Sequence, residues 1–233
     1  MKYSPAFIVP VGYDVGRPPR QYNDSLIVNG QNNNSNSPLQ IVNSTDVRCN
    51  SGAAIGTPLS SSTMTDAAGD ELGFVVEARF GHPGIQLVYL SWAPDGVGAA
   101  DYHGSGDWAN LRLLLSRPWE MFTIGEEGLP WAMRWKHPFR FPLSRTVPEG
   151  EYLLRAGGLA LHAAHELDCA QFYVGCAQTK VVGNGTGVLS PLMKLSGVLI
   201  PDFWRNITNY TEPGPALWPE GSRTQHVVKQ LDS

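Results

Sequence analysis

Short apolar segments, separated by clusters of Gly, Pro, Asn and Ser, follow one another along most of the chain. Several of them alternate apolar and polar residues with a period of two, which is the pattern of a strand with one buried face. The segments that we expect to form strands are 25–30, 71–80, 85–92, 140–144, 151–161 and 170–182. No helical pattern extends beyond a turn or two. The pattern therefore predicts an all-β fold, an antiparallel β-sandwich.

The length of the chain, 233 residues, suits one large β domain. We expect that domain to span residues 20–219, with long loops after about Trp92 and after Gly183, and residues 220–233 to form a polar tail too short for another domain. Residues 1–19 hold one Lys and a short apolar run broken by Pro10, which is a poor signal peptide. We expect them to be a leader or an irregular N-terminal extension, without a stable helix or strand.

Charge and sequence motifs limit the classes of partner. The formal net charge is −4 and no run of Lys or Arg occurs, which argues against nucleic acid. No apolar stretch approaches the roughly 20 residues of a membrane span. Six N-x-[ST] sequons point to a secreted glycoprotein, although Asn-rich loops also produce sequons by chance. They begin at Asn23, Asn33, Asn43, Asn184, Asn206 and Asn209.

The three cysteines, Cys49, Cys169 and Cys176, allow one disulfide and leave one thiol. A bridge from Cys49 to either of the others would close a loop of more than a hundred residues. Such a bridge contributes about 4–5 kcal/mol in the chain-entropy model. This favours a long-range bridge over the local pair, but the sequence alone does not choose the partner of Cys49.

Polar side chains gather in an otherwise apolar region, residues 159–178. Gln171 and Tyr173 are two apart, so on a strand they project to the same face. If the residues before them form a hairpin loop, His162 can lie beside them. A base, an amide and a phenol would then form one cluster that could carry chemistry. The alternative is that these side chains only satisfy one another's hydrogen bonds in the core.

Other catalytic patterns are weak. His82 lies just before an expected strand, and the remaining histidines lack the spacing of a zinc site. There is no Gly-rich phosphate loop before a helix and no G-x-S-x-G motif. Adjacent carboxylates such as Glu126-Glu127 are typical of solvated turns rather than of a glycosidase pair.

Several stretches together resemble a known family. "DVRCN", "HPGIQLVYLSW", "TNYTEPGPALW" and the long block from "VPEGEYLL" to "KVVGNG" are similar to the fungal lytic polysaccharide monooxygenases of auxiliary activity family nine. The resemblance runs from about Arg20 to Trp218. It implies an immunoglobulin-like antiparallel β-sandwich with a copper ion on a flat face. The ion is held by a "histidine brace", formed by the amino group and imidazole of an N-terminal histidine and by a second histidine.

The resemblance assigns roles to the polar cluster. Tyr173 matches the axial tyrosine, Gln171 the glutamine that supports it, and His162 the nearby histidine that helps to position oxygen. His82 matches the second copper histidine, although Ile85 and Gln86 replace the Pro-Val of family members. The catalytic set implied is therefore His162, Gln171 and Tyr173, with His82 and Tyr173 on the metal.

The resemblance also implies a disulfide and a sugar contact. Cys49 and Cys176 match the long-range disulfide of the family, and Cys169 has no counterpart, so we expect a free thiol there. Tyr210 matches a tyrosine that the family places on its flat face, where its ring stacks on a sugar. Ordinary loop packing is the alternative for Tyr210, because the sequons at Asn206 and Asn209 would place glycans beside it.

The start of the chain departs from the family pattern. Family members begin with His about ten residues before a V-N-G turn, and that count from Asn29-Gly30 leads to Arg20. No histidine precedes His82. Copper(II) favours neutral imidazole nitrogen, whereas a guanidinium stays protonated and offers no lone pair. Arg20 resembles the residue of family variants that have arginine in place of the first histidine.

Two functions follow from these observations. The first is a secreted, monomeric, monooxygenase-like protein with an incomplete copper site, altered or lost oxidative activity, and a role in binding glycans or at the cell surface. The alternative is an active copper-dependent enzyme that cleaves cellulose or another β-1,4-glucan. Because the ligand set is incomplete, the sequence favours the first.

Overall fold

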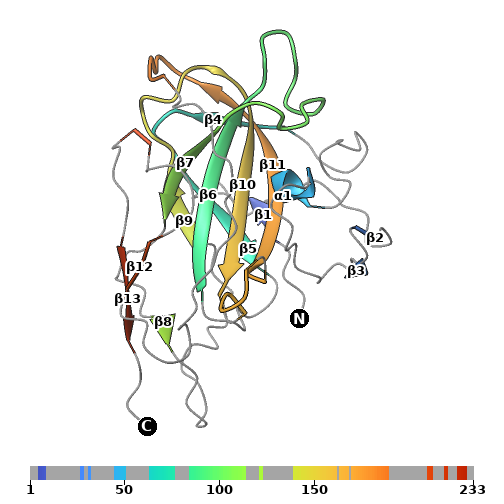
Figure 1. Cartoon of the computed structure of the whole chain (residues 1–233). Helices are drawn as coiled ribbons and strands as arrows, with labels where there is room; N and C mark the ends of the chain where they lie inside the picture. Colours follow the sequence, from blue (N-terminus) through green and yellow to red (C-terminus); the bar gives the residue numbers. More distant parts are fainter. Residues whose placement is uncertain are drawn as a thin grey trace.

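The computed structural model describes residues 5–8, 27–28, 31–32, 45–50, 63–76, 84–113, 121–122, 139–161, 163–167, 169–188, 209–211, 218–219 and 225–229. For some strand residues, Tyr173 and Tyr210 among them, the description covers the backbone and not the side chain. Strands dominate the described part of the chain, and its one α-helix is a single turn (Figure 1).

The largest sheet has five strands in the order β4-β11-β10-β6-β7. Long strands form its centre, and they run side by side in Figure 1. Their bounds are β4 Met64–Ala67, β6 Gly84–Trp92, β7 Trp108–Leu113, β10 Gly150–Ala160 and β11 Gln171–Val182. All neighbours are antiparallel except β4, which pairs in parallel with the last four residues of β11.

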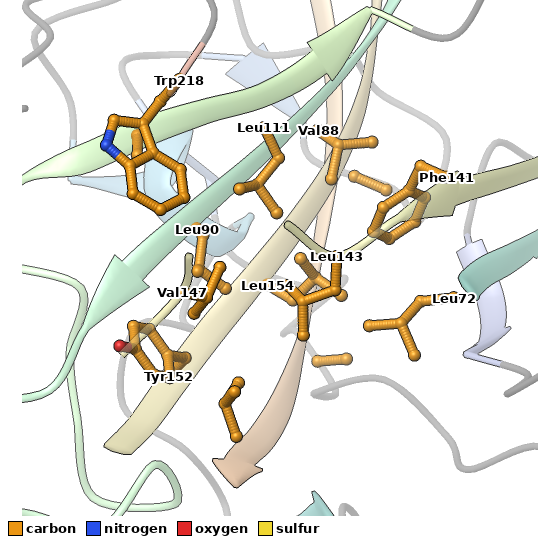
Figure 2. Close-up of a cluster of buried hydrophobic side chains, with 14 of the residues drawn as sticks. Leu72, Val88, Leu90, Leu111, Phe141, Leu143, Val147, Tyr152, Leu154 and Trp218 are labelled. Carbon is orange, nitrogen blue, oxygen red and sulfur yellow. The ribbon is translucent and has the colours of Figure 1, made fainter. Parts of the chain in front are cut away.

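A second sheet has three strands in the order β1-β5-β9, formed by Pro5–Ile8, Glu71–Val76 and Phe139–Pro142. Apolar side chains from both sheets meet in one buried cluster, and Figure 2 shows its larger members gathered between the strands. Leu72 and Phe141 come from the smaller sheet, and Leu90 and Leu154 from the larger one. Each such side chain contributes roughly 1.5–3 kcal/mol when it is buried. This core makes the molecule a β-sandwich, as the alternating pattern predicts.

Two smaller groups of strands and one helix complete the described structure. Strand β12 (Asn209–Thr211) pairs with β13 (Gln225–Lys229), and β13 pairs with β8 (Met121–Phe122). Strands β2 (Ile27–Val28) and β3 (Gln31–Asn32) form a small antiparallel pair. Helix α1 spans Asp46–Cys49. Val28 is paired with Gln31, and Asn29-Gly30 between them lies outside the described residues.

Most of the expected strands are present. The segments expected at 25–30, 71–80, 85–92, 140–144, 151–161 and 170–182 overlap β2, β5, β6, β9, β10 and β11. The all-β sandwich is confirmed, with parallel pairing only at β4–β11 and β8–β13 among the described strands. No helix in the described part of the chain is long and apolar enough to cross a membrane.

One expectation about the start of the chain was wrong. Residues 1–19 were expected to lack a strand, but Pro5–Ile8 forms β1 along an edge of β5. Its apolar run is too short to predict a strand by itself, and the strand forms through its pairing with β5. The expected polar tail contains β13, which is likewise formed through its pairing with β12 and β8.

Candidate functional site

Three strands of the large sheet have their ends in one row. Strand β6 begins at Gly84, β10 ends at Ala160, and β11 begins at Gln171. Gly84 is paired with Ala160, and Ala160 is paired with Gln171. Adjacent strands lie about 4.8 Å apart, so the row spans roughly 10 Å. We call this row, Gly84, Ala160 and Gln171, the site edge.

The residues predicted for the copper site flank the site edge in sequence. His82 comes two residues before Gly84, and His162 comes two residues after Ala160. His82, His162 and Arg20 lie outside the described residues. Strand β11 places the backbones of Gln171 and Tyr173 at this edge. The convergence of the four predicted side chains, His82, His162, Gln171 and Tyr173, stays a prediction.

Within β11, Gln171 is half-buried and Tyr173 is opposite Gly158 of β10. The side chain of Tyr173 lies outside the described residues. Strands β10 and β11 are antiparallel neighbours, so the segment between them is the hairpin loop that the argument for His162 requires.

That hairpin loop is compact in its described part. The amide of Ala164 donates to the carbonyl oxygen of Leu161 at 2.9 Å, and the amide of Glu166 donates to that of Ala163 at 3.3 Å. Ala164 is fully buried, which anchors the loop against the sheet. His165, Glu166 and Leu167 are exposed at its tip. The loop therefore presents one imidazole, one carboxylate and one apolar side chain to solvent near the site edge.

Cys169 lies in the same loop and is a free cysteine. It is half-buried, and its thiol donates to Oε2 of Glu166 at 3.6 Å. The described residues contain no group of three or more His, Cys, Asp or Glu side chains that could hold a metal ion. The predicted copper ligands, the side chains of His82 and Tyr173, lie outside the described residues.

The predicted sugar-stacking residue, Tyr210, belongs to β12 and is paired with His226 of β13. Its side chain lies outside the described residues, so its role stays a prediction. Among the sequons, Asn184 is exposed just after β11, and Asn209 is in β12. Asn23, Asn33, Asn43 and Asn206 lie outside the described residues.

Helix α1 lies against β11 (Figure 1). The structure contains a disulfide between Cys49 and Cys176, the pair that the family resemblance implies. Next to it, the side-chain amide of Asn50 donates to the carbonyl oxygen of Val174 at 3.1 Å. Both Asn50 and Cys49 are buried. The helix is therefore fixed on the strand that carries Gln171 and Tyr173.

A buried arginine in β10 forms a hydrogen bond to helix α1. Arg155 of β10 donates through Nη1 to the carbonyl oxygen of Val47 in α1 at 2.8 Å. Its guanidinium carbon lies 4.3 Å from the ring centre of Tyr89 and 4.9 Å from that of Trp108. Burial lowers the pKa of Arg155, and interaction with Tyr89 opposes this shift. Because both rings lie within the range of cation–π attraction, they offset part of the cost of burying the charge.

Asn50 and Arg155 were not predicted from the sequence as functional residues. A signal for Arg155 was present. Arg155 interrupts the apolar run "EYLLRAGGLAL", and a lone charge in a buried strand indicates a paired or stacked cation. Asn50 is the last residue of "DVRCN", a stretch that resembles the family.

The family model for auxiliary activity family 9, formerly glycoside hydrolase family 61, matches residues 7–216 of this chain. The chain belongs to auxiliary activity family 9. Among curated relatives, it is 36% identical over 192 residues to the family 9 lytic polysaccharide monooxygenase C of Emericella nidulans, covering 78% of this chain and 79% of that protein. It is 33% identical over 215 residues to monooxygenase H of Malbranchea cinnamomea, covering 83% and 90%.

Solved structures of family 9 proteins share the fold. The extended catalytic domain of Hypocrea jecorina LPMO9A superposes with a TM-score of 0.65 at 20% identity, covering 98% of this chain and 97% of that one. HiLPMO9B superposes with a TM-score of 0.64, also at 20% identity, covering 93% and 99%. At this level of identity, the structural likeness supports the family 9 β-sandwich and not a particular activity.

Proposed function

We propose that this family 9 protein is a secreted lytic polysaccharide monooxygenase-like protein with an incomplete copper site and altered or lost oxidative activity. Family 9 monooxygenases are copper enzymes that act on polysaccharides. The observation that carries the proposal is the absence of any histidine before His82 in the sequence. A two-histidine brace with an N-terminal histidine has no source for its first imidazole in this chain.

The donor chemistry at the expected position supports this reading. Arg20 would supply an α-amine after cleavage before it, but its guanidinium has no lone pair for a metal. The remaining donors would be the imidazole of His82 and the phenol of Tyr173, and a phenol is a weak ligand. A positive charge beside a dication also opposes binding. The donor set of this chain therefore does not fit a complete copper brace.

A second candidate function is an active copper-dependent monooxygenase that cleaves cellulose oxidatively. It is favoured by the hairpin that places the backbones of Gln171 and Tyr173 at the site edge, together with the monooxygenase names of the relatives. One solved relative is described as a cellulose-active polysaccharide monooxygenase from M. thermophila. Cellulose or another β-glucan is thus the polysaccharide to test first.

The proposed form of the mature protein is a monomeric, extracellular glycoprotein whose domain spans residues 20–219. The exposed position of Asn184 supports its use as a glycan acceptor. Cleavage before Arg20 would remove β1 and leave one edge of β5 without that partner. Sequencing the N-terminus of the secreted protein therefore determines both the first ligand and the composition of the smaller sheet.

The function is tested by incubating the secreted protein with cellulose, copper, a reductant and oxygen or peroxide. We expect no oxidised oligosaccharides above the background of a protein-free control. Arg20→His, processed so that residue 20 is the N-terminus, supplies the missing imidazole and should raise copper affinity. Abundant oxidised oligosaccharides from the Arg20 form would establish the second candidate instead.

A further inference from the structure

One edge of β11 is covered by two different elements. On one side β11 pairs with β10 along its whole length. On the other side β4 pairs with Thr179–Val182, and no strand among the described residues pairs there with the stretch from Gln171 to Gln178. Helix α1 lies beside this stretch (Figure 1). The carbonyl groups of a strand point sideways within the sheet, and those on an uncovered edge need other donors.

Asn50 supplies such a donor from an unfavourable backbone conformation. It follows α1 with φ 84° and ψ 171°, a region that is essentially restricted to glycine. Its own amide donates to the carbonyl oxygen of Asp46, which ends the helix. Glycine would make that backbone bond without the strain. The side chain must therefore offset the cost, and its amide donates to the carbonyl oxygen of Val174.

We propose that Asn50 is a positioning residue: its side-chain amide takes the place of a neighbouring strand at Val174 and fixes the part of β11 that carries Gln171 and Tyr173. The link to copper rests on the proposed function, because Gln171 and Tyr173 belong to the predicted copper site. The contact is immediately after Tyr173 in sequence and two residues before Cys176, where the disulfide holds α1 in place.

A contact farther along the same edge provides a matched control. The Thr63 hydroxyl lies 3.1 Å from Oε1 of Gln178, near the start of the β4 pairing. Like Asn50, it bonds to β11 from the side opposite β10. Unlike Asn50, it is remote from the site edge. Loss of the Thr63 bond should therefore leave residues 171–175 unaffected.

Hydrogen exchange measured by mass spectrometry on the intact, oxidised protein tests the proposal. In Asn50→Gly, which removes the amide but suits the backbone, we expect the exchange of segment 171–175 to rise roughly three- to tenfold. Segment 179–182 should exchange as in the wild type, and the melting temperature should change little. Asn50→Asp, which keeps the shape but cannot donate when ionised, should also loosen segment 171–175. Thr63→Val should not.

Unchanged exchange of segment 171–175 in Asn50→Gly would overturn the proposal, because Asn50 would then only end α1. Equal loosening of segments 171–175 and 179–182 would also overturn it, since Asn50 would then serve general stability. Should Asn50→Gly fail to fold, Asn50→Asp decides by the same comparison. None of these outcomes depends on copper, so oxidative activity in the Arg20 form would contradict the proposed function and leave this test intact.

A second readout links the loosened edge to the site. In a protein carrying Arg20→His, adding Asn50→Gly should weaken copper(II) binding several-fold, whereas adding Thr63→Val should leave it unchanged. Equal copper affinity with and without Asn50→Gly would contradict the positioning role even if exchange rises.

Discussion

Arg155 carries a positive charge into the layer between α1 and the large sheet. It is 5% exposed, and it combines a hydrogen bond to Val47 with contacts to two aromatic rings. An isolated buried charge costs several kcal/mol, and the hydrogen bond to Val47 and the two ring contacts offset part of that cost. It therefore joins the helix to the central strands of the sheet.

Replacing Arg155 should destabilise the protein more when the new side chain leaves a larger cavity. Arg155→Ala leaves a cavity between Tyr89 and Trp108 and an unpaired carbonyl at Val47, and should lower the free energy of unfolding by about 3–4 kcal/mol. Arg155→Met fills the space and should cost about 1–2 kcal/mol. Urea denaturation measures both. Equal losses for the two variants would show that the space between the rings contributes nothing.

Asp66 is a buried carboxyl group in β4 whose stability contribution depends on pH. Its pKa is raised above the ordinary value of 3.8, chiefly by burial, and the hydroxyl of Thr179, which donates to Oδ2, partly opposes the shift. The charge of Asp70 raises the pKa further. The folded state therefore holds the proton to higher pH than the unfolded chain does. The stabilisation from protonated Asp66 is complete below 3.8 and is lost as pH rises through the folded-state pKa.

The variant Asp66→Asn stays neutral, so its free energy of unfolding relative to the wild type should increase between pH 4 and pH 7. Denaturation at a series of pH values measures the difference. Thr179→Val, which removes the hydroxyl that lowers the pKa, should move the transition of Asp66 to higher pH. A difference between Asp66→Asn and wild type that is flat across this range would contradict the assignment.

At the scale of elements, α1 depends on contacts far away in the sequence. It is one turn long, and the side chain of Thr45 at its N-terminus makes no capping hydrogen bond. An isolated helix of this length does not form in water. The disulfide to Cys176, at a sequence separation of 127, and the bonds from Arg155 and Asn50 hold it in place.

The disulfide should be a major source of stability. In the chain-entropy model, closing a loop of this length contributes about 5 kcal/mol, so Cys49→Ser combined with Cys176→Ser should lower the free energy of unfolding by about that amount. Guanidinium denaturation of the purified variant measures the change. Cys169→Ser is the control, since that thiol forms no bridge, and should change stability by less than about 1 kcal/mol. A comparable loss in both proteins would argue against a special role for the bridge.

The elements differ in how well the sequence predicts them, for physical reasons. Long strands such as β10 and β11 carry enough apolar and aromatic residues to be predicted from pattern alone. Strand β4 reads "MTDA", which has little β-propensity, and it forms through parallel pairing with β11 and burial of Met64 and Asp66. Strands β1 and β13 are equally dependent on their partners. Tertiary pairing of this kind leaves no local pattern.

At the scale of the molecule, the sandwich brings segments from distant parts of the sequence to one edge. The hairpin of β10 and β11 could be expected from sequence, because its two strands are adjacent in the chain. The position of β6 beside β10 was not predicted, since strand order is not encoded in local pattern. The supporting contacts of Asn50 and Arg155 depend on α1, which was not predicted as a helix. The hairpin that carries Gln171 could thus be predicted, but not the position of β6 or the contacts that hold α1.

The central claim is that this family 9 sandwich lacks the donors of a complete copper brace. Calorimetric titration of the secreted, N-terminally sequenced protein with copper(II) tests it most directly. Losing a direct ligand should cost more than the roughly 10- to 100-fold typical of outer-shell changes, so we expect the Arg20 form to bind copper more than about 100-fold more weakly than Arg20→His. Tight one-to-one binding by the Arg20 form, equal to that of Arg20→His, would contradict the claim.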